Sequence, residues 1–162
     1  MTILAPHKNA QYEPHRIAGG LVLIGYEDGN GELHAIKASS FNSLSLAPRL
    51  VMWCIAHARD GAVEIPEGAR CGLSVMGADQ RDLWIHCVNQ YDSSRFQWIK
   101  GSGLGVPLVE QAAAAFEVKV SRRINLGGHV LHIGEVHSFG YSQGCDGLTN
   151  YLDDLSVPLL HE

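Results

Sequence analysis

The sequence has no excess of positive charge. Among its 162 residues, Lys and Arg number 12 and Asp and Glu number 17, which gives a formal net charge of −5. No basic cluster is longer than Arg122–Arg123. Proteins that bind nucleic acid neutralise its phosphates with clustered Lys and Arg. We therefore expect no nucleic-acid partner.

Long apolar runs are also missing. A membrane-spanning helix needs about 18 consecutive apolar residues, and no run in this chain reaches that length. The first sixteen residues, MTILAPHKNAQYEPHR, lack the apolar segment of a signal peptide because His7, Lys8 and Glu13 interrupt it. We expect a cytoplasmic protein without membrane contact.

The cysteines and histidines show no ligand spacing. There are four cysteines and no C-x-x-C pair, so reduced thiols that pack as small apolar side chains are the simplest reading. The nine histidines are scattered, with neither an H-E-x-x-H motif nor Cys/His spacing. We expect no metal site.

What the chain does contain is a series of short apolar segments separated by turn signals. Its length fits one domain, residues 1–162, in which the polar residues 1–15 form an N-terminal arm or a partner contact. Residues 21–26 and 33–38 flank the turn signal EDGNGE and predict a β-hairpin. Residues 50–56 predict a strand that is buried on both faces, and residues 71–76 predict another strand.

The second half adds one helix and a second strand pair. Apolar residues recur at helical spacing over residues 77–91, with Asp79 as an N-cap or first-turn acid. Residues 115–123 alternate, with Glu117 among the side chains that face water, and residues 129–138 are the expected partner strand; the alanine run 112–115 could still be helical. The KGSGLG segment (100–105) is read as a flexible loop rather than a phosphate loop, because no strand precedes it and Pro107 follows. Many short strands and one or two helices predict a β-barrel or sandwich.

The most informative segment is the serine-rich run that precedes the strand at 50–56. Four serines and Phe41 lie within residues 39–45. Short hydroxyls and backbone N–H groups suit a phosphate or a polar ring edge, and the following strand would hold them rigidly. A plain loop that makes turns with its own hydroxyls is the alternative.

Four segments, in order, resemble the flavin reductase-like, FMN-binding split-barrel family. They are SSFNSLSLAPRLV (39–51), SVMGADQ (74–80), GVPLVEQAAAAFEVKVSRRI (105–124) and GGHVLHIGEV (127–136). In the first, Leu44 replaces the usual Val and Arg49 the usual second Pro. The resemblance implies a mainly β fold, an antiparallel Greek-key split β-barrel with one or two helices. It also implies a homodimer with flavin at or near the interface.

The resemblance further implies an NAD(P)H:flavin oxidoreductase. Such an enzyme moves a hydride from NADH or NADPH to FMN or FAD, and it can supply reduced flavin to a partner monooxygenase. The flavin provides the difficult chemistry, so no Ser–His–Asp set is required. The protein has to position the nicotinamide next to the flavin.

The same resemblance assigns site residues. Ser39, Ser40 and Phe41 align with the turn that contacts flavin, and Ser43 is a weaker candidate. Lys37 could pair with flavin phosphate or with the N1–C2=O2 edge, or it could be a solvated strand lysine.

Three further positions follow from the aligned motifs. Arg59 could bind the flavin phosphate or be a surface arginine. Gln80, next to the capping Asp79, is a ligand candidate. His129 matches the histidine of the family's G-D-H and is the expected catalytic residue, which hydrogen-bonds the nicotinamide amide or relays a proton.

Two departures keep other functions open. Gly128 replaces the usual Asp before the histidine, and the tail ends PLLHE, so Tyr141 or Tyr151 would have to supply the aromatic cover. A flavin-binding protein without turnover is one alternative. The other is a repurposed split barrel that acts on a small organic substrate in a biosynthetic pathway, with His57, His86 and Arg59 as its unusual polar groups.

Overall fold

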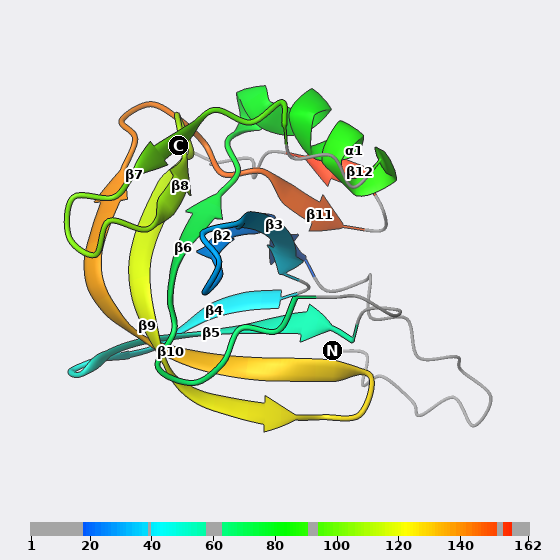
Figure 1. The fold of residues 1–162 in the computed structure, drawn as a ribbon. Coiled ribbons are helices and arrows are strands. Elements are labelled where there is room, and N and C mark those ends of the chain that lie inside the picture. The colour runs from blue at the N-terminus through cyan, green and yellow to red at the C-terminus, as the bar shows by residue number, and fades with distance from the viewer. Residues whose placement is uncertain (1–17, 39, 58–62, 91–93, 152–153, 157–162) are drawn as a thin grey trace, which may run out of the picture.

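The chain folds around one seven-stranded antiparallel sheet (Figure 1). The computed structural model describes residues 18–38, 40–57, 63–90, 94–151 and 154–156. Within these ranges the strand order is β3-β2-β6-β9-β10-β5-β4, and the sheet curls so that β3 comes back to contact β5. Two small sheets, β1-β11-β12 and β7-β8, and one short helix flank it. The predicted mainly β split barrel is confirmed.

The bounds of the elements are as follows. The main sheet contains β2 Val22–Glu27, β3 Leu33–Ala38, β4 Ser40–Leu46, β5 Arg49–Ala56, β6 Arg70–Val75, β9 Ala114–Asn125 and β10 His129–Tyr141. The small sheets contain β1 Gly19–Gly20, β7 Trp98–Lys100, β8 Pro107–Val109, β11 Thr149–Tyr151 and β12 Asp154–Ser156. The helix α1 is Arg81–Gln90, preceded by a 3₁₀ turn at Ala78–Gln80. No helix in these described ranges is both long and apolar enough to cross a bilayer.

The predicted β2–β3 hairpin is confirmed, and its turn is built by one aspartate. Asp28 Oδ1 accepts hydrogen bonds from the backbone N–H groups of Asn30 (2.8 Å) and Glu32 (3.0 Å). Its other oxygen lies 3.0 Å from His34 Nε2. These contacts lower the pKa of Asp28, with the His34 hydrogen bond as the largest cause. Three potential metal ligands lie close together here: Asp28, Glu32 and His34. Both carboxylate oxygens of Asp28, however, already make hydrogen bonds within the hairpin.

The prediction that β5 is buried on both faces is wrong. Along β5 the residues alternate: Val51 and Trp53 are buried inside the barrel, whereas Met52 and Cys54 on the outer face are only half-buried. The sheet is antiparallel, and one of its faces is left uncovered here. The composition of β5 is apolar on both faces even though only the inner face is enclosed within the described residues.

The helix also begins later than predicted. The N-cap of the 3₁₀ turn is Gly77 rather than Asp79, which is instead the acidic residue of the first turn. Gln80 Oε1 accepts the Gly77 N–H (3.0 Å), and Gln80 Nε2 donates to the Glu110 carbonyl (2.9 Å). From Arg81 the chain is α-helical, and Trp84 packs into the smaller of two apolar clusters.

The predicted pair of strands at 115–123 and 129–138 is confirmed as β9 and β10, and it carries two irregularities. Ser121 is skipped between the pairs Ile133–Arg122 and Gly134–Val120. His137 is skipped between the pairs Val136–Val118 and Ser138–Glu117. A β-bulge of this kind leaves one extra residue unpaired and bends the strand. The alanines at 114–115 belong to β9, so the helical alternative for this run is wrong.

Glu117 does not face water as predicted, because its side chain is only 2% exposed. The loop at residues 101–105 folds over it, and its carboxylate accepts three backbone N–H groups: Gly103 (2.7 Å), Leu104 (2.6 Å) and Gly105 (3.1 Å). A glycine is needed at 101, since a Cβ there would lie 2.2 Å from Glu117 Cδ. The expectation that no strand precedes the KGSGLG segment is wrong, because β7 ends at Lys100. The loop at 101–105 is an anion nest that is filled by the chain's own carboxylate.

Inside the barrel, the rings of two buried residues stack on each other, and their ring nitrogens make few hydrogen bonds. Trp53 and His132 are almost fully buried, and their rings stack at 5.3 Å with an interplanar angle of 6°. His132 Nε2 lies 3.3 Å from the Ile65 carbonyl oxygen, so this nitrogen carries the proton. Nδ1 has no hydrogen-bond partner in the described chain. Burial therefore disfavours a second proton on this ring.

His132 makes stability depend on pH. Burial lowers the pKa of His132 below its ordinary value of 6.5, so the unfolded chain binds more protons than the folded chain once the pH falls below that value. We expect the free energy of unfolding to be level above pH 6.5 and to decrease below it until the folded-state pKa is passed. Urea unfolding at a series of pH values measures this. His132→Phe should flatten the decrease, whereas an unchanged slope in that variant would contradict the assignment.

Candidate functional site

The serine-rich run forms β4, the edge strand of the main sheet. Ser40 lies on the outer face and is exposed, whereas Phe41 faces inward, with its ring centroid 5.5 Å from that of Phe116. Ser43, on the same side as Phe41, is exposed at the mouth of the barrel. Within the described residues, β4 pairs only with β5. The N–H and C=O groups on its other edge are therefore available to a ligand. Ser39 lies outside the described residues.

His129 and Ser40 come together at one end of β5. Ser40 is opposite Cys54 in the β4–β5 pair, and His129 is opposite Ala56 in the β5–β10 pair. Cys54 and Ala56 are two positions apart along one strand, so their side chains lie on the same face. The exposed hydroxyl of Ser40 and the exposed imidazole of His129 therefore share the outer face of the sheet.

His57 is tied to the turn just before His129. Its backbone N–H donates to the Gly128 carbonyl oxygen (2.9 Å), and its Nε2 lies 3.1 Å from Asn125 Oδ1. The same Asn125 oxygen accepts the Gly127 N–H (3.1 Å). These contacts join the end of β5 to the β9–β10 turn. The turn over residues 125–128 is a sequence prediction that rests on Asn125 and the Gly-Gly pair, but no local signal indicates that the Asn125 amide also contacts His57.

The other predicted site residues do not join this group within the described residues. The Lys37 ammonium lies 5.7 Å from the centroid of the Trp84 ring, a cation–π contact at the side of the helix. Gln80 is buried, and its amide holds the 3₁₀ turn as described above. Its role as a flavin ligand, like that of Lys37, stays a prediction. Arg59 lies outside the described residues.

The chemical groups on this outer face match those that the isoalloxazine ring of a flavin requires. The polar edge of the ring needs backbone donors and acceptors, and the open edge of β4 next to Ser40 provides them. The inner side of β4 fits less well. The pocket beside Phe41 and Ser43 has a volume of about 180 Å³, which is below the 300–1,000 Å³ of sites that enclose drug-sized ligands. The flavin contacts expected for Phe41 and Ser43, which line this pocket, stay predictions.

Comparison with known proteins gives matches over most of the chain. A profile described as "Flavin reductase like domain" matches residues 15–160. The NADH-dependent flavin reductase of Rhodococcus sp is 30% identical over 134 residues, which cover 80% of this chain and 74% of that protein. The actinorhodin polyketide dimerase of Streptomyces coelicolor is 27% identical over 126 residues, 76% of this chain and 70% of that protein.

Solved structures agree with this fold. BorF, the flavin reductase component of a bacterial two-component tryptophan halogenase, superposes with a TM-score of 0.76 and 26% identity. The match covers 88% of this chain and 92% of that chain. With a profile that spans residues 15–160 and a relative at 30% identity, this chain belongs to the flavin reductase like domain family.

Proposed function

We propose that this protein is an NAD(P)H:flavin oxidoreductase that transfers a hydride from NADH or NADPH to FMN or FAD. The observation that carries this is the match of the family profile to residues 15–160, together with a relative named NADH-dependent flavin reductase at 30% identity. The flavin supplies the hydride-accepting ring. The chain's own residues bind and orient the two ring systems so that the transfer becomes effectively unimolecular.

The geometry on the outer face supports specific roles. The open edge of β4 next to Ser40 would hold the polar edge of the flavin ring. His129, on the same face, would hydrogen-bond the nicotinamide amide or move a proton to the reduced ring. Ser39 and Arg59 keep their proposed roles at the flavin edge and the phosphate. Because Gly128 provides no carboxylate, the His57–Asn125 contact would fix the turn that carries His129.

We also propose a homodimer that uses the outer face of β5, β9 and β10. The residues there alternate with the barrel core, and the outer faces of such strands are usually polar. Here five of these residues are apolar and none of the five is fully buried: Met52, Cys54, Ile124, Leu131 and Ile133. Charged residues, Arg122, Lys119 and Glu135, lie on the same face. Ser40 and His129 border this face. A second copy would therefore exclude water from the proposed flavin site.

The partner of the reduced flavin is proposed from the relatives. BorF is described as the reductase component of a two-component halogenase, and a relative of 28% identity is named NADH-dependent flavin reductase StyB. We propose that this chain likewise supplies reduced flavin to a separate monooxygenase or halogenase. A cytosolic location is also proposed, supported by the use of NAD(P)H and by four cysteines that form no disulfide bond in the described structure.

A second candidate function is a split barrel that acts on a small organic molecule. The actinorhodin polyketide dimerase, which matches 76% of this chain, favours it. A flavin-binding protein without turnover is the third reading, motivated by Gly128. The three readings differ in whether NADH reduces the flavin, and in whether flavin binds at all.

One experiment separates them. Purified protein is mixed anaerobically with FMN or FAD, and its visible spectrum is recorded before and after addition of NADH or NADPH. Bleaching of the flavin band with catalytic amounts of protein is expected. A flavin band that shifts on binding but persists with both nicotinamides would favour the carrier. No bound flavin and no bleaching would contradict the proposed reductase.

A further inference from the structure

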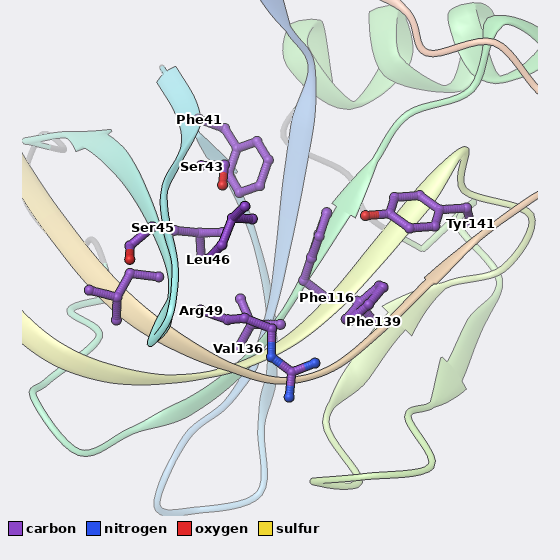
Figure 2. Close-up of a pocket in the computed structure, with 11 residues that line it drawn as sticks. Phe41, Ser43, Ser45, Leu46, Arg49, Phe116, Val136, Phe139 and Tyr141 are labelled. Atoms are coloured by element: carbon purple, nitrogen blue, oxygen red, sulfur yellow. The ribbon is translucent and has the colours of Figure 1, made fainter.

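The inner side of β4 forms a hollow on the opposite face of the strand from Ser40. Figure 2 shows Phe41, Ser43 and Leu46 on one wall, facing Phe116, Phe139 and Tyr141 on the other. The rings touch in sequence: the centroids of Phe41 and Phe116 lie 5.5 Å apart, those of Phe116 and Tyr141 6.2 Å, and those of Phe139 and Tyr141 5.6 Å. Several of these apolar side chains remain open to solvent, with Leu46 87% exposed. The hollow is therefore an aromatic-lined site at the barrel mouth.

The volume of the hollow fits a ligand with a single aromatic ring. Its volume is about 180 Å³, and an apolar protein cavity of about 150 Å³ binds benzene. One aromatic ring with a small substituent fits, whereas the three fused rings of a flavin do not. Edge-to-face contacts such as that of Phe116 and Tyr141, whose planes meet at 86°, suit the insertion of another ring.

One cation stands at the rim. Arg49 begins β5, and its guanidinium carbon lies 5.6 Å from the centroid of the Phe139 ring. Within the described residues, Arg49 makes no ion pair with a carboxylate. The hydroxyl-bearing residues Ser43 and Ser45 also line the hollow, while no acidic side chain does. A planar guanidinium matches a carboxylate in two parallel hydrogen bonds, so the charge and the rings together fit an aromatic acid.

We propose that this hollow binds a monocyclic aromatic carboxylate. The ring would enter between Phe41, Phe139 and Tyr141, and the carboxylate would meet Arg49. The site is separate from the proposed flavin site, because Ser40 is on the opposite face of β4 and His129 is at the far end of β10. The proposal therefore does not depend on reductase activity.

Binding of benzoate to the flavin-free protein tests it. We expect saturation transfer from the protein to benzoate by NMR, and an affinity that falls about tenfold or more in Arg49→Met, which keeps most of the side-chain length and removes the charge. Arg122→Met, on the same sheet but outside the hollow, is the matched control and should bind benzoate as the unchanged protein does. Benzyl alcohol, with the ring but no charge, should bind more weakly than benzoate.

Three results would overturn the proposal. One is absence of benzoate binding in the folded protein, and another is equal loss in Arg49→Met and Arg122→Met. The third is occupation of the hollow by a second copy: the unchanged protein would then be a dimer that does not bind benzoate, and Leu46→Ser would convert it to a monomer in sedimentation velocity. A Phe139→Leu variant that retains its fold by circular dichroism but loses binding would support the ring site independently of charge.

Discussion

Replacing Glu117 by Gln is expected to lower the free energy of unfolding by about 2–4 kcal/mol, because buried backbone N–H groups would lose their hydrogen-bond acceptor. The carboxylate is 2% exposed and accepts three backbone N–H groups of the loop at 101–105. Gln keeps the shape but replaces one oxygen by an NH₂ group, which would point donors at donors. Neighbouring backbone N–H groups would then lose their acceptor where water has little access.

Denaturant unfolding followed by tryptophan fluorescence measures this effect. Glu135→Gln is the matched control, since Glu135 lies exposed on β10 and surface substitutions usually change stability by less than about 0.5 kcal/mol. Amide hydrogen exchange adds a local measurement: the N–H groups of Gly103 and Leu104 should exchange faster in Glu117→Gln. Equal stability of the two variants would show that the loop does not depend on this carboxylate.

Replacing His129 by Ala is expected to reduce kcat/KM for NADH by about tenfold if only a hydrogen bond is lost, and by about 100-fold or more if a proton relay is lost. The residue is exposed at the start of β10 and shares a face with Ser40. Its side chain has no protein partner among the described contacts, so its removal should leave stability unchanged. The loss would then report on the reaction rather than on the fold.

Two further variants identify what His129 does. His129→Gln retains a hydrogen-bond donor, so it should recover most of the activity if the imidazole only holds the nicotinamide amide, and little if it moves a proton. His137→Ala changes an exposed histidine near the other end of the same strand and should behave like the unchanged protein. If His129→Ala oxidises NADH as fast as the unchanged protein does, His129 is not part of the site.

Most of the fold could be predicted, because its signals are local. The EDGNGE turn between two apolar runs predicts the β2–β3 hairpin, and the turn residues alone account for it. Alternation at residues 115–123 likewise predicts β9. Glu117 could be predicted only in part. The alternation places it correctly on the outer face of β9. Its burial could not be predicted, because it depends on the loop at 101–105 folding over that face in the tertiary structure.

The candidate site was predicted less completely. Ser40 and His129 are 89 residues apart in sequence and share one end of β5 only because β4 and β10 pair with opposite edges of that strand. The motif resemblance named both residues, although neither periodicity nor spacing does. For Gln80, whose role as a flavin ligand stays a prediction, the structure adds a second role that the motif does not indicate: its amide holds the backbone of the 3₁₀ turn. No periodic signal distinguishes a residue that holds a turn from one that holds a ligand.

The bulge at His137 bears on how this barrel tolerates changes in length. Val136 and Phe139 both face inward although they are three positions apart, because His137 is the extra residue between them. Loss of one residue at 137 would leave an ordinary alternation, with every later side chain still in its present register. Loss of one residue at 135 would instead rotate part of β10 and move Val136 out of the core. Related barrels should therefore differ in length at this bulge. At this position the strand can lose a residue while the same side chains continue to face the core.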